Sequence, residues 1–385
     1  MGGAASAGHL VHLVRSGRAR TRRELQDVTG LSRSALLQRI DLLTGTGYLR
    51  AAGVHRSTGG RPPALLEFNT RHRLVLAADL GATHARTALV DLAGQVLAEE
   101  YAEIDITDGP AAVLTWLGDR FDRLAGAADG DIAGIGLGLP GPVDHRTGRL
   151  VEPPIMPGWH DFGVREHLHD RFGVPVLADN DANLMALGEH TAGHPDCPAL
   201  VLVKVATGIG AGIIVDGAPF RGVDGGAGDI GHIRIPGHDD VRCMCGATGC
   251  LAAVASGRAI ARQLDDAGFP TRTSREALAR LRAGEPLAQH LTRVAGRLVG
   301  DVLATVVCLV NPGVLVLSGD FADTHFVTGV RETLYQRALA RATRHLDVRT
   351  GRLGDRAGVV GAAAMVADAL YSPDAIDDRL AAHPG

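Results

Sequence analysis

The chain has 385 residues, of which 45% are hydrophobic and 21% are charged, and its net charge is −4. This length and composition predict a globular protein of two or three domains and exclude a disordered or fibrous chain. No uncharged apolar run is long enough to span a membrane, and the amino terminus lacks the pattern of a secretory signal, so we expect a cytoplasmic protein with no membrane partner. Five cysteines, three of them between positions 243 and 250, suit metal binding in a reducing compartment better than a disulfide framework.

The charge is distributed unevenly. Residues 1–71 contain 11 arginines and four acidic residues, a net charge of +7, whereas the rest of the chain carries −11. A basic head on an acidic body is typical of a DNA-binding module joined to a domain with another task, although a solvated basic surface is the alternative. Lys204 is the only lysine. We attribute that to codon bias rather than to mechanism.

Three helices are predicted in the head. The segment 10–14 is amphipathic, Thr21 and Glu24 form a capping box for a second helix, and Ser32 caps a third helix that ends near Leu43. The hydrophobic spacing of the third helix leaves four polar residues facing outward. These candidate DNA contacts are Arg33, Ser34, Gln38 and Arg39.

A two-stranded wing is predicted after the third helix. A glycine-rich stretch separates Arg50 from the strand-like Ala64–Phe68, and Arg61 at its tip can enter a minor groove. The short turn at 28–31 fits a helix-turn-helix, whose arginine and glutamine side chains can pair with guanine and adenine in the major groove. We therefore predict that residues 1–71 form a winged helix-turn-helix that binds double-stranded operator DNA. A small helical packing module is the alternative.

From residue 72 onward, buried strands alternate with glycine-rich turns, which predicts an α/β body. Three of these turns have the character of phosphate loops, because glycine lets a phosphate approach the backbone closely. Each turn taken alone also fits a tight hairpin. The candidate nucleotide-binding residues are Asp79, Gly81, Thr83, Thr207, Gly208, Gly210 and Gly319.

Asn180 and Asp181 follow a predicted strand at 174–179 and open a helix over Ala182–His190. Ligands of open α/β sheets usually bind at the carboxyl ends of strands. In a phosphorylation, Asp181 would accept the hydroxyl proton and Asn180 would orient the sugar. Simple capping of the helix by Asp179 or Asn180 is the alternative.

A metal cluster is predicted where Cys243, Cys245 and Cys250 form a C-x-C-x4-C loop. Three thiolates and an upstream histidine make a tetrahedral Zn²⁺ set without an open position, so the zinc would be structural. We favour His232 as the fourth ligand, because its other ring nitrogen could then contact a bound sugar, and His238 is the rival. Buried free cysteines are the alternative without metal.

Together these segments resemble the ROK family of repressors, open reading frames and kinases, specifically its members with an amino-terminal winged helix. The resemblance covers roughly residues 10–370, and its most specific motif is Gly-x-x-Gly-His, ending at His232, followed by the cysteine loop. It implies an α/β fold in which a two-lobed, ribonuclease-H-like body of the actin and sugar-kinase type follows the head. Lobe 1 would comprise residues 72–186 completed by a helix at 355–371, and lobe 2 residues 187–354 with the zinc loop. The residues that the resemblance assigns to a sugar are Asn180, Asp181, Asp229 and His232, with Asp181 the catalytic base in kinase members.

Several positions depart from the pattern of the sugar kinases. Asp229 and Ala252 stand where these kinases carry glutamates, and Pro154 replaces a residue that often contacts the sugar. Glycines of the nucleotide loops are also replaced, and an added methyl or carboxylate in a phosphate cradle opposes ATP binding. The replaced positions are Ala82, Ala206 and Asp320.

We therefore expect a sugar-responsive transcriptional regulator, a repressor of carbohydrate genes, that acts as a homodimer or higher homo-oligomer. A sugar or sugar phosphate in the cleft would change the angle between the lobes and so the spacing of the DNA heads. The alternative is an active hexose or amino-sugar kinase that uses ATP and Mg²⁺ and also binds DNA. A regulator controlled by a protein partner, with a vestigial cleft, is a third possibility.

Overall fold

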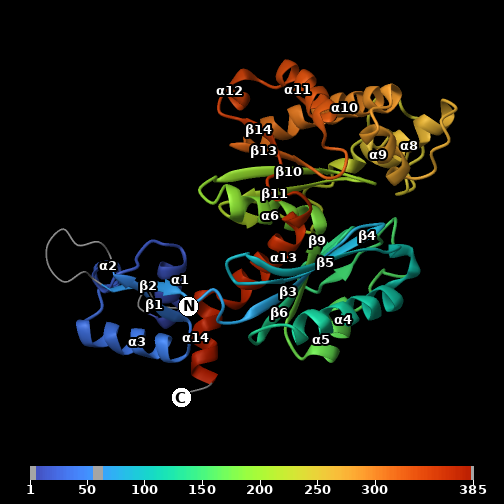
Figure 1. Ribbon diagram of the computed structural model, residues 1–385. Coiled ribbons are helices and arrows are strands. Elements are labelled where there is room, and N and C mark those ends of the chain that lie inside the picture. The colour runs from blue at the N-terminus through green and yellow to red at the C-terminus, as the bar shows by residue number, and fades with distance from the viewer. Residues whose placement is uncertain (1–5, 55–63, 383–385) are drawn as a thin grey trace.

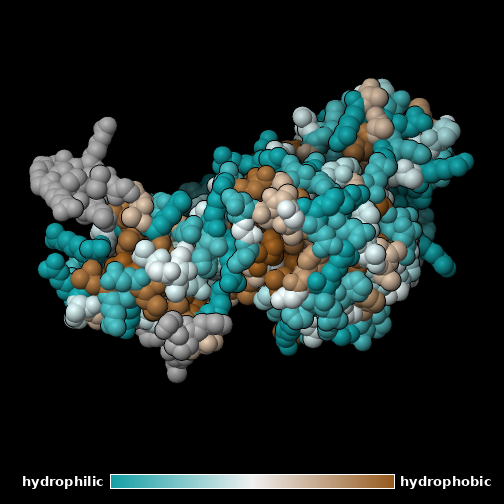
Figure 2. All heavy atoms as spheres, turned by 60° about the horizontal axis from the view of Figure 1, so that its bottom comes forward, coloured by the Kyte–Doolittle hydropathy of each residue, from teal (hydrophilic) through white to brown (hydrophobic). Residues whose placement is uncertain are grey.

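The computed structural model describes residues 6–54 and 64–382. In Figure 1 an amino-terminal head lies to one side of a body, and the body consists of two lobes stacked on each other. Figure 2 shows another view of the molecule, in which the head projects from the body. Hydrophilic residues cover most of the surface seen in this view. Within the described residues no single helix is long and apolar enough to cross a membrane, and only the bent pair Gly354–Leu370 with Pro373–Ala382, at 57°, reaches that length and composition when the two are taken together.

The head contains three helices followed by an antiparallel pair of strands. The capping box is present, with Thr21 accepting from the Glu24 backbone N–H and Glu24 accepting from that of Thr21. Gly30 ends the second helix in the left-handed conformation, at φ +68°. Arg61, the predicted minor-groove contact, lies outside the described residues. The elements are α1 (Ala7–Arg15), α2 (Arg22–Thr29), α3 (Arg33–Gly45), β1 (Leu49–Val54) and β2 (Ala64–Phe68).

Lobe 1 is built on a five-stranded mixed sheet in the order β5-β4-β3-β6-β9. Because side chains alternate along a strand, β3 buries Leu76 and Ala78 against one set of helices and Val75 and Ala77 against another. The first set is α4 (Pro110–Gly126) and α5 (Val164–Phe172), and the second face is covered by α13 (Ala357–Leu370). The strands are β3 (Leu74–Leu80), β4 (His84–Val90), β5 (Val96–Glu103), β6 (Ile132–Leu139) and β9 (Val176–Asn180), with the small hairpin β7 (Val143–Asp144) and β8 (Arg149–Leu150). The helices are η1 (Ile106–Asp108), α4 (Pro110–Gly126) and α5 (Val164–Phe172).

Lobe 2 repeats this plan with a second five-stranded sheet, in the order β12-β11-β10-β13-β14. Its helices enclose a core on one face of the sheet, and α6 packs on the other face. The strands are β10 (Ala199–Val205), β11 (Ile209–Val215), β12 (Ala218–Pro219), β13 (Val314–Ser318) and β14 (Asp347–Thr350). The helices are η2 (Ile230–His232), α7 (Leu251–Ala255), α8 (Gly257–Asp266), α9 (Ser274–Arg282), α10 (Pro286–Val310), α11 (Thr324–Arg337), α12 (Ala340–Thr343) and η3 (Gly354–Arg356).

Two helices, α6 (Asp181–Gly193) and α13 (Ala357–Leu370), lie between the two sheets and join the lobes (Figure 1). They touch backbone to backbone: a Cβ on Gly361 would stand 1.8 Å from the Leu184 carbonyl oxygen, so no side chain fits at this crossing. α6 runs across the predicted lobe boundary at 186 and contributes to both lobes. The helix predicted over 355–371 is α13.

A last helix, α14 (Pro373–Ala382), was not predicted from the sequence. It packs on α1 of the head, where Asp377 accepts from the Gly8 backbone N–H at 2.8 Å and Ile376 is fully buried. Arg15 of α1 also pairs with Asp368 of α13 at 2.8 Å. The carboxyl-terminal segment thus fastens the head to lobe 1, and the apolar cores of the two are continuous.

Candidate functional site

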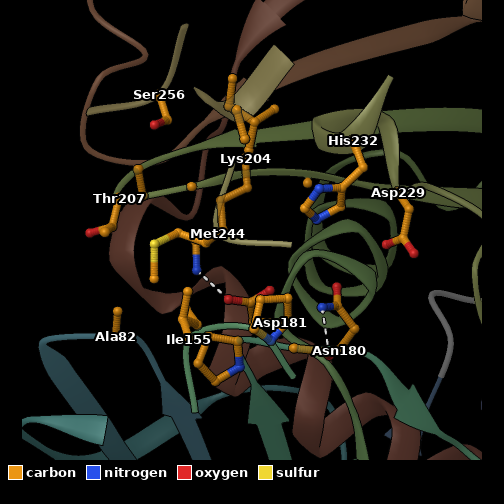
Figure 3. A pocket seen from close by; sticks show the side chains of 18 of the residues that line it. Ala82, Ile155, Asn180, Asp181, Lys204, Thr207, Asp229, His232, Met244 and Ser256 are labelled. Atoms are coloured by element: carbon orange, nitrogen blue, oxygen red, sulfur yellow. Dashed lines mark hydrogen bonds and ion pairs between the residues drawn. The ribbon is translucent and has the colours of Figure 1, made fainter. Parts of the chain in front are cut away.

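A cleft of about 320 Å³ opens between the two lobes. In Figure 3, Asn180 and Asp181 of lobe 1 face Lys204, Asp229 and His232 of lobe 2 across it. The structure therefore brings together the four residues expected to meet a sugar. It adds Lys204, which had no expected role.

Asn180 ends β9 and caps α6. Its side-chain oxygen accepts from the Ala182 N–H at 2.9 Å, and its amide nitrogen donates to the Gly141 carbonyl at 3.1 Å. The capping alternative is thus present in the structure. Because Asn180 also lines the cleft, capping fixes its side chain at the edge of the site rather than removing it.

Asp181 begins α6, and its side chain is only 9% exposed. Its Oδ2 lies 2.5 Å from the Lys204 ammonium nitrogen, and Lys204 is itself 14% exposed. Burial alone would lower the pKa of Lys204, but the carboxylates of Asp181, Asp79 and Asp320 together raise it. The candidate base is therefore held in a buried ion pair.

Asp229 precedes η2 and His232 is its last residue, and both line the lobe 2 side of the cleft. Burial raises the pKa of Asp229, and the neighbouring His232 opposes that rise. An exposed carboxyl and an exposed imidazole at the wall of the cleft are suited to accepting and donating hydrogen bonds with sugar hydroxyls.

The expected phosphate turns reach the cleft only in part. Gly81, Thr207, Gly208 and Gly210 line it, together with the replacements Ala82 and Ala206. Thr207 hydrogen-bonds Ser274 at 3.0 Å. The remaining candidates, which do not line the cleft, are Asp79, Thr83 and Gly319. Gly319 has φ +93°, and a Cβ there would stand 2.5 Å from the Val205 carbonyl oxygen, so the backbone conformation and the packing both require glycine there without any phosphate.

Asp79 is buried at the end of β3, and its Oδ1 has no hydrogen-bond partner. Burial raises its pKa to about 6, against the opposing charge of Lys204. A Cβ on Gly358 would stand 2.2 Å from Asp79 Oδ2, so this carboxylate lies directly against the start of α13.

Replacing Asp79 with asparagine should therefore stabilise the fold at pH 8. The folded protein binds a proton near pH 6 and the unfolded chain near 3.8, so between these values the folded state holds more protons, and its stability falls as the pH rises. Above pH 6 the buried Asp79 carboxylate lowers the free energy of unfolding by its full amount, which is roughly 3 kcal/mol by the shift in pKa. Urea unfolding should show a gain for Asp79→Asn that shrinks from pH 8 to pH 5, whereas the exposed Asp129→Asn should show none. A gain independent of pH would contradict this origin.

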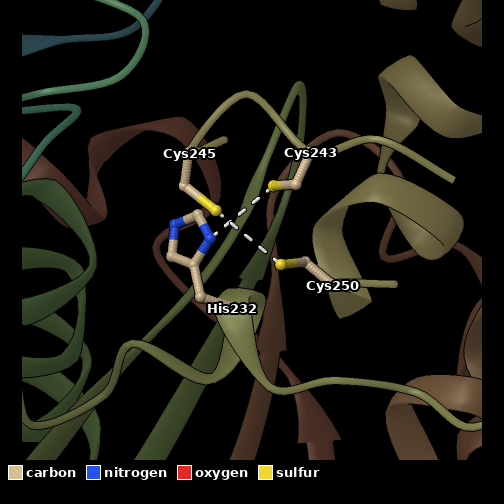
Figure 4. Close-up of side chains that lie close together, drawn as sticks. All are labelled: His232, Cys243, Cys245 and Cys250. Atoms are coloured by element: carbon tan, nitrogen blue, oxygen red, sulfur yellow. Dashed lines mark hydrogen bonds between the residues drawn. The ribbon is translucent and has the colours of Figure 1, made fainter. Parts of the chain in front are cut away.

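The predicted His/Cys cluster forms next to the cleft (Figure 4). Four ligand atoms, from His232, Cys243, Cys245 and Cys250, lie within 4.8 Å of one another. His232 Nδ1 is 3.7 Å from the Cys243 sulfur, and the Cys245 and Cys250 sulfurs are also 3.7 Å apart. Burial and the neighbouring thiols raise the pKa of Cys250 to about 12. His238, the rival ligand, is not in this group.

On the head, α3 presents the predicted DNA-contact residues at its surface. Arg33, Ser34 and Gln38 are exposed, whereas Arg39 is half-buried and lies 3.5 Å from the Ala35 carbonyl oxygen. The exposed Arg33 and Gln38 are thus placed to meet a partner, whereas the Ser34 hydroxyl lies 3.2 Å from that of Ser32 and Arg39 is partly engaged by its own helix.

The family model described as ROK family matches residues 75–369, which is more than half of the chain. The chain belongs to the ROK family. Residues 1–74 lie outside that match.

Relatives of two kinds are similar to this ROK protein. The xylose repressor of Caldicellulosiruptor bescii is 30% identical over 92% of this chain and 93% of its own length. The glucokinase of Halalkalibacterium halodurans is 31% identical over 75% of this chain and 93% of its own length. Among solved structures, a ROK family transcriptional regulator described as a homologue of the E. coli Mlc protein has a TM-score of 0.78 at 26% identity, covering 96% of this chain and 97% of that one.

Proposed function

We propose that this ROK protein is a sugar-responsive transcriptional repressor of carbohydrate genes. The observation that carries the proposal is the extent of the match with the xylose repressor, which leaves only 8% of the chain unmatched and so extends into the head that precedes residue 75. A glucokinase of similar identity matches over a smaller share of this chain. The protein would act in the cytoplasm, on the DNA that its head binds.

The head acts as the operator-binding module. A winged helix-turn-helix consists of three short helices and an antiparallel pair of strands, and the head has these elements, with a capping box at the start of α2. In this arrangement α3 would lie in the major groove. Its exposed Arg33 and Gln38 can pair with guanine and adenine respectively. The +7 charge of residues 1–71 would supply contacts to phosphates.

The cleft acts as the effector site for a sugar or sugar phosphate. Asp181 of lobe 1 and Lys204 of lobe 2 offer an acceptor and a donor side by side, and Asp229 and His232 offer the same combination within lobe 2. A ligand held by both lobes favours one angle between them, which is the condition for an allosteric effect.

Zinc fits the His/Cys cluster. Two thiolates bound at about 2.3 Å to one tetrahedral ion stand roughly 3.8 Å apart, and the sulfurs of Cys245 and Cys250 are 3.7 Å apart. With His232 and Cys243 the shell has four protein ligands, so the ion would be structural. Its role here would be to hold His232 in place beside the sugar.

The lobes are coupled to the head through α13 and α14. α13 starts against Asp79 at the cleft side and crosses α6, and its far end leads into α14, which lies on α1. A change in the angle between the lobes would therefore displace the segment that fastens the head. In a dimer this displacement would change the spacing of the two recognition helices.

Measurements of operator binding test whether α3 recognises the DNA sequence. Gln38→Ala and Arg33→Ala should each weaken binding to specific operator DNA by about 1–3 kcal/mol while changing random-sequence binding less. Arg282→Ala, which removes the same charge from an exposed position on α9, should change neither. Fluorescence anisotropy with operator and scrambled duplexes at one salt concentration measures both. Equal losses on the two duplexes would show that α3 does not read the sequence.

The proposal as a whole is tested by screening sugars and their 6-phosphates, with xylose, glucose and N-acetylglucosamine as the first panel. One of them should raise the melting temperature and change operator affinity without any nucleotide. Sugar-dependent ADP release at ordinary enzymatic rates, on the order of 1–10³ per second, would instead establish the kinase alternative, which retention of Asp181 keeps open.

A further inference from the structure

Lys204 lies on β10 of lobe 2 and lines the cleft. It is the only lysine of a chain with 39 basic residues. On β10, Val203 and Val205 point into the core of lobe 2, whereas Leu200 and Leu202 face α6. By strand alternation Lys204 continues the second row and is the residue of that row that reaches the cleft. The cationic side chain of Lys204 is therefore on the same face of β10 as Leu200 and Leu202.

Lys204 forms an ion pair with Asp181, the candidate base. Its ammonium donates to Asp181 Oδ2 at 2.5 Å, while Asp181 Oδ1 accepts from the Ala182 N–H at 2.7 Å. Both carboxylate oxygens are thus occupied by donors from the protein itself. Figure 3 shows the lysine side chain reaching across the cleft from lobe 2 to make this contact.

A second buried carboxylate depends on the same ammonium. Asp79 is 9% exposed, and its Oδ1 has no hydrogen-bond partner. Lys204 is the strongest opposing charge that acts on Asp79, whereas Asp181 raises the pKa of Asp79 by like-charge repulsion. One lysine therefore balances two carboxylates that would otherwise repel each other in a buried setting.

Mg²⁺ that carries a nucleotide is usually held by one or two protein carboxylates together with the phosphates, and Asp79 and Asp181 beside a glycine-rich turn could supply them. An ammonium that is already paired with Asp181, and whose charge also acts on Asp79, competes with the metal for the same negative charge. The methyl groups of Ala82 and Ala206 also line the cleft, where glycine would leave more room for a phosphate. Magnesium nucleotide therefore does not fit the residues present.

We propose that Lys204 is the resident counter-cation of this cleft: by its ion pair with Asp181, close to Asp79, it excludes a divalent metal and keeps Asp181 from accepting a hydroxyl proton. The cleft then binds a sugar without phosphorylating it. This inference deepens the proposed function, because it assigns to one residue the difference between an effector site and a kinase site.

The test measures metal binding alone, with Mn²⁺ as the probe and the zinc-loaded full chain as the sample. Removing one positive charge next to two carboxylates should strengthen Mn²⁺ binding by about 10- to 1,000-fold. Lys204→Met should therefore show this gain in titrations followed by electron paramagnetic resonance. Lys204→Arg keeps the charge and should behave as the wild type, and the double variant Asp181→Asn with Lys204→Met should lose most of the gain.

Folding is checked on the same samples by melting temperature and zinc content, and Lys204→Gln replaces the methionine variant if the latter does not fold. A folded neutral variant that binds Mn²⁺ no better than the wild type overturns the proposal. An equal gain in Lys204→Arg overturns it too, since the effect would then come from altered packing. Because neither DNA nor sugar is present, these outcomes are independent of whether the protein is a sugar-responsive repressor.

Discussion

Replacing Cys245 with serine should release about one zinc ion per chain and lower the free energy of unfolding by more than about 3 kcal/mol. Structural zinc contributes roughly 10–16 kcal/mol in small zinc domains, and a larger body retains part of its stability without it. The loss should be concentrated in lobe 2, because the cluster ties η2 to Cys250, the residue that precedes α7. Metal analysis by mass spectrometry and urea unfolding measure the two effects.

The effect should extend to the effector site. His232 contributes Nδ1 to the cluster and lines the cleft, so its ring loses its anchor when the metal leaves. We expect Cys245→Ser to weaken the response to the sugar while leaving operator binding by the head intact. Cys308→Ser provides the matched control, because Cys308 is exposed on α10 and is not in the cluster. Freshly prepared, unchelated protein without zinc would contradict the prediction.

Features encoded by neighbouring residues were predictable from the sequence. The capping box at Thr21 and Glu24 and the buried strand before Asp79 depend on spacings of a few residues, and both elements are present. The cysteine loop is equally local, and only its histidine had to be chosen between two candidates. The ROK fold was predictable for the same reason, since the motifs that carry the resemblance, such as the one that ends at His232, are each only a few residues long.

Features that depend on distant contacts were not predictable in the same way. The role of Lys204 appears only when β10 is placed beside α6, because Asp181 lies 23 positions away in the chain. For Asn180 the two roles were predicted, but as alternatives. The structure shows that the residue both caps α6 and lines the cleft. A signal for Lys204 was present, namely a single lysine in an arginine-rich chain, but composition could not place it next to a carboxylate.

The helix α14 was missed for a related reason. Its residues are ordinary for a surface helix, and what defines its role is the close approach of α1, more than 360 positions away in the sequence. Gly8 makes that approach possible. A Cβ at this position would stand 2.0 Å from the Pro373 carbonyl oxygen, which is backbone and cannot turn aside. The contact between the head and the end of the chain therefore depends on the absence of one methyl group.

Gly8→Ala should consequently uncouple the head from the cleft. The added methyl forces α1 and α14 apart, so a change in the angle between the lobes no longer reaches α3. Tenfold regulation corresponds to about 1.4 kcal/mol of coupling, which is small enough for this displacement to abolish. The variant should bind operator DNA and the sugar with near-normal affinities, yet the sugar should no longer change operator affinity. Anisotropy titrations with and without saturating sugar measure the coupling directly.

Gly45→Ala is the matched control for this prediction. Gly45 ends α3 in the same head, and nothing lies within 4 Å of the position that its Cβ would take. Alanine is favoured over glycine in a helix by about 0.5–1 kcal/mol, so this variant should be as stable as the wild type or slightly more stable, and it should respond fully to the sugar. If Gly8→Ala retained the full response, the signal would pass from lobe 1 to the head by the other contacts between them, the Arg15–Asp368 ion pair with α13 and the segment after β2. In that case α14 would serve only to hold the head in place.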